Sequence, residues 1–296
     1  MVLAMEPRAG TQTPEIMRRR LRLALREARE AAGITQKEAA TALYSSVSKI
    51  IRMEQGVVAI TPTDLQVLLA LYGVTDKERV AELVDLAQGS KRRSWGEYKE
   101  VYSPASLSLF GSEAAAKTVY KYEPTFVPGL LQTQEYAEAL LTGLGHSKKD
   151  VELMVRARVE RQELLDREVR PELHIILGEA AVSRAVGGQG AMRRQLERIK
   201  ELRTRPGILL QVLPFSAGEH PHIGGAFTIL EFADLDDLLY LENAGGERTI
   251  RDEPEVLSDY YETFATLESM ATKPDDLAAV LDRVKAERFE ETSNPL

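Results

Sequence analysis

A chain of 296 residues, 44% hydrophobic and 28% charged, has the composition of a globular protein with room for two domains. It contains no cysteine, which excludes disulfides, thiol catalysis and cysteine-based zinc sites. No apolar run approaches the roughly 20 residues that span a bilayer, and the first residues lack the apolar segment of a secretory signal. We therefore expect a cytoplasmic protein that does not enter a membrane.

The net charge of −8 is distributed unevenly along the chain. Residues 1–72 hold 10 Lys and Arg against 7 Asp and Glu, a net of +3, so the remaining residues carry −11. This balance argues against a protein that coats nucleic acid over its whole surface. A mildly basic head on an acidic body is typical of a specific DNA-binding protein with a separate sensor or partner domain.

Residues 1–14 show no hydrophobic periodicity and are predicted to form a disordered arm. Residues 15–32 then place Leu21 and Leu25 four apart, which predicts an amphipathic helix that Gly33 ends. We interpret the arginines of this helix as a solvated face with some members in contact with phosphate: Arg18, Arg19, Arg20, Arg22, Arg26 and Arg29.

Residues 35–56 read TQKEAATALYSSVSKIIRMEQG and have the caps and apolar spacing of two short helices joined by a tight turn. Thr35 and Glu38 are placed to form a capping box at the start of the first helix. Small alanines on its inward face allow the two helices to cross closely. The turn is predicted at Tyr44 and Ser45.

The second helix of this pair is predicted to begin after Ser46, its N-cap, and to end at Gly56. Ile50 and Met53 lie three apart on the face directed at the core. The remaining face has short side chains near the helix N-terminus and basic side chains further on. Its residues are Val47, Ser48, Lys49 and Arg52. Such a face suits the major groove of DNA.

Two more helices are predicted at residues 63–71 and 77–88, so that five helices form a DNA-binding domain over residues 15–88. Residues 89–94 contain a basic cluster and are predicted to form a linker. The domain boundary is placed there.

Beyond the linker the hydrophobic periodicity becomes mixed. Short apolar runs predict strands at residues 173–177, 208–214, 226–232 and 238–242, and residues 114–122 are predicted to start as helix and end as strand. Helices are predicted at residues 134–141, 148–167, 189–203, 255–270 and 275–288. The chain is therefore predicted to be multidomain, with an all-α five-helix head and a mixed α/β (α+β) domain over residues 95–290.

The best candidate for an enzyme or metal site is the Gly-rich loop with Glu219, His220 and His222. Two histidines two apart can ligate a metal, yet no third ligand follows at a recognisable spacing. The sequence also lacks the HExxH and GxSxG motifs. We therefore expect no catalysis, no bound metal and no cofactor.

The order T-Q-x-E-A-A-x-x-L, then S-x-S-K-I-x-R-x-E-x-G, resembles the lambda-repressor-like, or Xre-type, family of helix-turn-helix regulators. Further segments resemble a C-terminal domain of unknown function found in actinobacterial regulators of this family, in Streptomyces and relatives: WGEYKEV, YEPTFVPGLLQT, RVERQELL, LHIILGEAAVSRAVGG, QVLPFSAGEHP and GGAFTILEF. Both resemblances together cover roughly residues 15–285. They imply a transcriptional regulator, often encoded beside a small acidic partner protein.

The resemblance also implies roles for single residues. Gln36 would bond the DNA backbone, and Ser46 would cap its helix and donate to phosphate. The groove would be faced by Val47, Ser48, Lys49 and Arg52, of which Lys49 or Arg52 suits the acceptors of guanine. The chain departs from its relatives at Val47, where they often have proline, and at Ile51, where they usually have a small polar residue.

Two functions remain open on this basis. The first is a sequence-specific transcriptional regulator of double-stranded DNA on the nucleoid, whose C-terminal domain senses a partner protein or a small-molecule effector. The second is an antitoxin-like interaction module that binds a small acidic partner, with DNA binding mainly for autoregulation. A closed apolar pocket would favour a small-molecule sensor, and broad apolar patches would favour a partner surface. We expect a homodimer, because proteins with one recognition helix commonly bind paired half-sites.

Overall fold

The computed structural model describes residues 13–56, 58–90, 95–221, 225–243, 246–251 and 253–289. Contacts divide the chain into two units, Met1–Gly96 and Glu97–Leu296. The predicted arm lies outside the described residues up to position 12, and so do residues 91–94 of the predicted linker. Within the described ranges, none of the helices is both long and apolar enough to cross a membrane.

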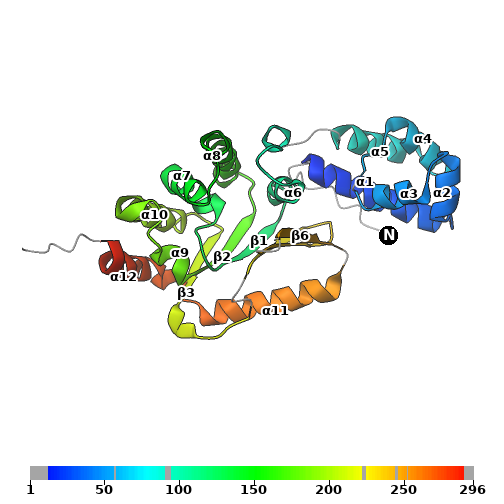
Figure 1. Ribbon diagram of the computed structural model, residues 1–296. Coiled ribbons are helices and arrows are strands. Elements are labelled where there is room, and N and C mark those ends of the chain that lie inside the picture. Colours follow the sequence, from blue (N-terminus) through cyan, green and yellow to red (C-terminus); the bar gives the residue numbers. More distant parts are fainter. Residues whose placement is uncertain are drawn as a thin grey trace, which may run out of the picture. The chain divides into compact units, whose positions relative to one another are not determined.

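The N-terminal unit consists of helices, as predicted (Figure 1). Their bounds are α1 Pro14–Ala31, α2 Gln36–Ala42, α3 Val47–Glu54, α4 Pro62–Leu71 and α5 Lys77–Gly89. The first helix starts earlier than expected, because the Thr13 side chain accepts a hydrogen bond from the Ile16 N–H and Pro14 occupies the first turn. Thr13 and Pro14 therefore belong to the helix and not to the arm.

A single apolar cluster holds these helices together, and the predicted inward faces supply it. It includes Leu21 and Leu25 of α1, Ile50 and Met53 of α3, and the fully buried Leu65 of α4. Apolar burial of this kind is the main favourable term in the stability of a small helical domain, since isolated helices of seven to ten residues are marginal in water.

The prediction of a solvated arginine face on α1 is wrong for half of its members. Arg19, Arg22 and Arg29 are only 6%, 6% and 9% exposed. Long arginine stems can cover apolar surface while the guanidinium finds polar partners. In this helix the charged residues are part of the packing between helices.

The C-terminal unit is built on a six-stranded sheet in the order β3-β2-β1-β4-β5-β6, which confirms the predicted α+β class. The strands are β1 Thr118–Glu123, β2 Glu172–Gly178, β3 Ile208–Leu213, β4 Ala226–Glu231, β5 Leu238–Asn243 and β6 Gly246–Ile250. The pairs β1/β2 and β2/β3 are parallel, and the other neighbours are antiparallel. Ile175, Ile176 and Leu177 of β2 are buried on both faces, which explains their continuous apolar run.

Helices cover both faces of this sheet (Figure 1). They are α6 Pro104–Glu113, α7 Gln134–Gly143, α8 Lys148–Gln162, α9 Glu179–Ser183, α10 Gly188–Leu202, α11 Pro254–Met270 and α12 Leu277–Phe289. Phe264 and Leu267 of α11 pack on one face against Phe227 and Ile229 of β4. Helices α7, α8 and α10 lie over the opposite face (Figure 1).

Two local contacts fix the ends of the parallel strands. The Thr272 N–H donates to the carbonyl of Val212 at 2.9 Å and the Thr272 hydroxyl accepts from the Val212 N–H at 3.1 Å, so the chain after α11 pairs with the outer edge of β3. Where β2 ends, a Cβ on Gly178 would lie 2.5 Å from the carbonyl oxygen of Pro124.

Three elements of this unit were not predicted: α6, α9 and β6. Helix α6 contains small and polar residues and a glycine, PASLSLFGSE, and so lacks a clear apolar stripe. Strand β6, GERTI, is a polar edge strand whose first residues are exposed. The segment predicted to start as helix at residue 114 instead follows α6, and its strand β1 begins at Thr118.

Candidate nucleic-acid interface

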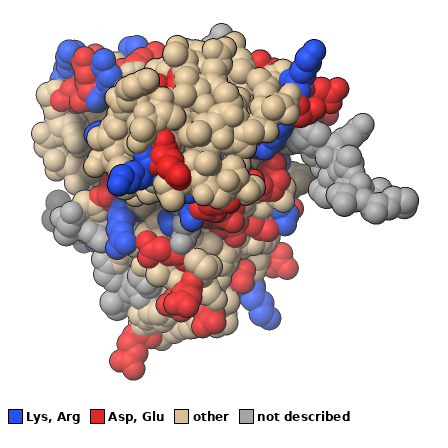
Figure 2. Space-filling model, turned by 90° about the vertical axis from the view of Figure 1, so that its right-hand side faces the viewer, with Lys and Arg blue, Asp and Glu red and all other residues tan. Residues whose placement is uncertain are grey.

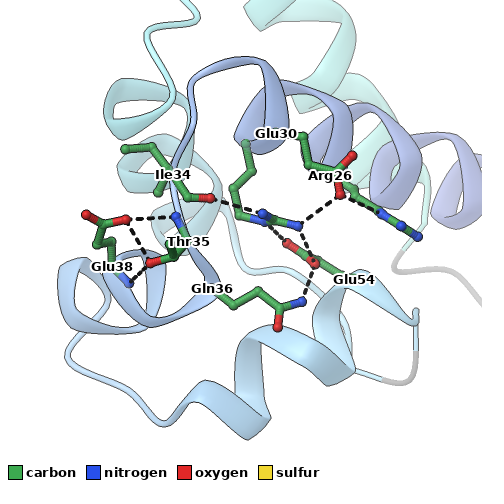
Figure 3. A network of polar contacts seen from close by, with 8 residues as sticks. Arg26, Glu30, Ile34, Thr35, Gln36, Glu38 and Glu54 are labelled. Carbon is green, nitrogen blue, oxygen red and sulfur yellow. Dashed lines mark hydrogen bonds and ion pairs between the residues drawn. The ribbon is translucent and has the colours of Figure 1, made fainter.

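Helices α2 and α3 form the predicted pair, and local hydrogen bonds fix where each begins. The Glu38 N–H donates to the Thr35 hydroxyl at 3.2 Å, and the Thr35 N–H donates to the Glu38 carboxylate at 2.8 Å (Figure 3). The predicted capping box is therefore confirmed. The Glu38 carboxylate accepts from the Thr35 N–H and also, at 2.7 Å, from the Thr35 hydroxyl, and these two bonds lower the pKa of the Glu38 carboxyl.

The turn between the two helices is left-handed at Tyr44, with φ of +48°. The Tyr44 N–H donates to the Thr41 carbonyl at 3.1 Å, and the Ser45 N–H donates to the Ala40 carbonyl at 2.9 Å. This pair of bonds is a Schellman cap, whose left-handed position is usually glycine. A residue with a Cβ pays about 1 to 2 kcal/mol for that conformation.

Helix α3 presents four of the predicted DNA-binding residues to solvent. The Ser46 hydroxyl caps the helix by accepting from the Lys49 N–H at 3.2 Å, and Ser46, Val47, Ser48 and Arg52 are all exposed. The Arg52 Nε donates to the Ser48 carbonyl at 3.2 Å, which leaves the terminal nitrogens of the guanidinium able to donate to a ligand.

Lys49 is in a different position, because its side chain turns toward α4. Its Nζ lies 3.0 Å from an Asp64 carboxylate oxygen in the first turn of that helix, and both side chains are partly buried. The ammonium of Lys49 is thus already paired within the unit. To bond a guanine it must leave Asp64 or share its remaining hydrogens.

Gln36 also has an intramolecular partner. Its Nε2 donates to the Glu54 carboxylate at 2.8 Å, and the same carboxylate accepts from Arg29 Nε at 2.5 Å (Figure 3). Arg29 further donates to the Ile34 carbonyl at 3.0 Å. This network joins α1, the start of α2 and the end of α3. One hydrogen of the Gln36 amide is used by Glu54, and the second is available for a phosphate.

On the face of the molecule that Figure 2 shows, Lys and Arg are scattered among Asp and Glu. An interface of this type relies on a few placed contacts more than on a broad basic field. Neutral donors such as Ser46 and Gln36 suit phosphate oxygens, and Arg52 suits the O6 and N7 acceptors of guanine.

Three residues of this region had no predicted role in DNA binding. Tyr44 was placed in the turn without a function, although glycine would be expected there. No local pattern in the sequence connects Asp64 to Lys49 or Glu54 to Gln36, because only the folded chain brings these side chains together. Ile51, which the sequence left without a role, is half-buried.

The histidine loop of the C-terminal unit is described only in part, since His222 lies outside the described residues. His220 Nε2 lies 3.4 Å from the Tyr122 hydroxyl, and its Nδ1 lies 2.9 Å from the Pro221 carbonyl oxygen. In the part of the chain that the structure describes, no group of three or more His, Cys, Asp or Glu side chains is placed to hold a metal ion.

Comparison with protein families matches both parts of the chain. The family model of a domain of unknown function, DUF5753, covers residues 107–283, which is more than half of the 296 residues. The chain belongs to the DUF5753 family. Ahead of the DUF5753 match, a model described as a helix-turn-helix domain covers residues 20–83.

The DUF5753 match begins within α6 and ends within α12, so it spans the whole six-stranded sheet. The helix-turn-helix match contains α2 and α3 and all of the predicted DNA-binding residues. Searches of curated proteins and of solved structures found no match. The helix-turn-helix domain supports a DNA-binding regulator.

Proposed function

We propose that the protein is a sequence-specific transcriptional regulator of the Xre type that binds double-stranded DNA as a homodimer. Helix α3 enters the major groove, where Arg52, Ser48 and Val47 read base edges. Ser46 and Gln36 hold the phosphates on either side. The role is one of binding, without catalysis.

The observation that carries this proposal is the separation of exposed and buried side chains on the two sides of α3. Ser46, Val47, Ser48 and Arg52 are exposed together on α3, while Ile50 and Met53 on its other side are buried. The exposed face thus has short side chains near the helix N-terminus and a guanidinium one turn further on. Base readout in the major groove uses side chains at the N-terminal part of a recognition helix.

Selection from a library of random duplexes with the full-length protein, at one stated salt concentration, tests the proposal. We expect a sequence motif with two half-sites related by a two-fold axis, about one helical turn or a multiple apart. Recovery of duplexes without a shared motif would contradict sequence-specific binding.

We further propose that the C-terminal unit sets the occupancy of the operator when it binds a partner protein or a ligand. One open groove of about 410 Å³ on this unit is strongly charged, and it is lined by Thr133, Gly190, Arg193, Arg194, Glu197, Arg198 and Glu201. Arg194 in this groove is held by a two-bond ion pair with Glu135, at 2.5 and 2.7 Å. A groove lined by charged side chains of both signs favours a polar protein surface over an apolar small molecule.

Footprinting with and without the protein encoded by the nearest small gene tests this second part. A change of occupancy at the same sites supports control by a partner. Unchanged occupancy would count against a protein partner and favour a small-molecule effector.

Dimerisation through the C-terminal unit makes a separate prediction. Residues 1–90 alone should bind the selected duplex more weakly than the full chain, since a monomer engages one half-site at a time. Equal affinities of the two proteins would count against a dimer built by the C-terminal unit.

A further inference from the structure

The turn of the helix pair contains the one residue in the described ranges that has a side chain and a positive φ, Tyr44. Helices α1, α4 and α7 end with the same two hydrogen bonds as α2. In each cap, one bond is donated by the N–H of the left-handed residue and the other by the N–H of the residue that follows it. In all three, the left-handed residue is glycine: Gly33, Gly73 and Gly145. Among these four helices, only α2 has a residue other than glycine at this cap position.

The Tyr44 side chain gains nothing from its own unit that would offset this strain. It is 99% exposed, the highest exposure among the large apolar and aromatic side chains described as exposed. Burial of a tyrosine ring would stabilise the fold, but here the ring stands in solvent. A strained residue with an exposed side chain indicates a use outside the folded unit.

The place of Tyr44 in the fold indicates what that use is. It stands two residues before Ser46, the N-cap of α3, on the chain that leads into the proposed recognition helix. It lies outside the face of α3 that carries Val47, Ser48 and Arg52. A side chain at such a position reaches the sugar-phosphate backbone beside the groove more readily than the base edges within it.

We propose that Tyr44 is a DNA-binding residue whose phenol hydroxyl donates a hydrogen bond to a phosphate oxygen next to the groove that α3 enters. This inference rests on the proposed function and adds one backbone contact to it. The phenol is a neutral donor, so the contact raises affinity for duplexes of every sequence without adding to the release of counterions.

The test uses the full-length protein and a mixed-sequence duplex several helical turns long, because a phosphate contact does not need the operator. Affinity is measured over a range of salt concentrations for wild type, Tyr44→Gly and Tyr44→Phe. We expect both variants to bind about tenfold more weakly, as loss of a hydrogen bond to a charged group predicts. The slope of log affinity against log salt should stay as in wild type.

Two controls accompany these variants. Thermal unfolding of Tyr44→Gly should show a midpoint no lower than that of wild type, since glycine fits the left-handed turn, and so weaker binding cannot come from a damaged fold. Tyr72→Phe makes the same chemical change at a buried position of the same unit, and its affinity should stay within about twofold of wild type.

The outcomes separate this inference from the proposed function. If wild type binds duplex DNA but Tyr44→Gly or Tyr44→Phe binds equally well, the phosphate contact is wrong and the regulator remains. If Tyr44→Gly changes the oligomeric state and not the affinity, the side chain serves a second copy of the chain and the inference is likewise overturned. If wild type binds no duplex, both proposals are wrong.

Discussion

Arg52 and Lys49 lie about one turn apart on α3, but they differ in whether the cation is already paired with a carboxylate. Arg52 is exposed, whereas Lys49 is paired with Asp64 at 3.0 Å. Replacing Arg52 with alanine should cost about 1 to 3 kcal/mol of binding and relax the preference at one base pair. Lys49→Ala should cost less, because the wild-type lysine must first give up part of its ion pair.

Affinities for the selected duplex and for each of its single-base variants measure both effects. Asp64→Asn is the matched control, since it frees Lys49 without removing it and should strengthen binding to all duplexes alike. A larger loss for Lys49→Ala than for Arg52→Ala would show that the pairing with Asp64 does not persist on DNA.

Glu38 makes a prediction about pH. Its hydrogen bonds with Thr35 lower its pKa from the ordinary value of 4.5, so the ionised carboxylate stabilises the folded state. This stabilisation is fully present above the ordinary pKa and is lost as pH falls through the lower pKa of the folded state. The difference in melting temperature between wild type and Glu38→Gln should therefore be constant near neutral pH and shrink below pH 4.5.

Thermal unfolding followed by circular dichroism from neutral to acidic pH measures that difference. A difference that persists at the lowest pH would mean that Glu38 acts through packing and not through its charge.

At the scale of elements, the Arg29–Glu54 pair ties α1 to α3, and both side chains are only 11% exposed. Arg29→Met would leave a buried carboxylate with Gln36 as its main partner, so we expect a loss of about 3 kcal/mol in the free energy of unfolding. Arg26→Met is the matched control on the same helix. Its pair with Glu30 is 52% and 53% exposed and should contribute less than about 0.5 kcal/mol.

Denaturant unfolding of the two variants gives the comparison. Similar losses would mean that the buried pair is no better than a surface one. Because Arg29 no longer holds the Glu54 carboxylate to which Gln36 is bonded, Arg29→Met should also bind DNA more weakly at temperatures where it stays folded.

The elements that the sequence predicted well are those defined by local patterns. Thr35 and Glu38 are three residues apart, so their capping box is visible in the sequence, and the apolar spacing of Ile50 and Met53 gave the buried side of α3. The pairs Lys49–Asp64 and Gln36–Glu54 are 15 and 18 residues apart. Which of these side chains meet depends on how helices cross, and no periodicity encodes that.

In the C-terminal unit the same distinction holds. The apolar strand β2 was predicted because it is buried on both faces, whereas β6 was missed because an edge strand needs no apolar run. The order of the strands, with β1 between β2 and β4, is set by tertiary pairing. The purpose of the unit is not encoded in any local motif that the sequence offers.

At the scale of the whole molecule, each unit has an apolar cluster of its own, around Leu65 in one and Leu267 in the other. Both leucines are fully buried, so replacing either with alanine should cost about 2 to 5 kcal/mol. We expect each change to destabilise the unit that contains it. Hydrogen exchange in the other unit should stay unchanged. Equal loss of protection in both units would show that they unfold as one cooperative body.

The contact at Gly178 has a consequence for how the family can vary. Because a Cβ there would lie 2.5 Å from the Pro124 carbonyl oxygen, even alanine would push the ends of β1 and β2 apart. In a saturation library screened for folded protein, glycine alone should survive at this codon, while the exposed face of α3 accepts many residues. Related proteins would then differ mostly on the exposed face of α3. They would vary little at the end of β2.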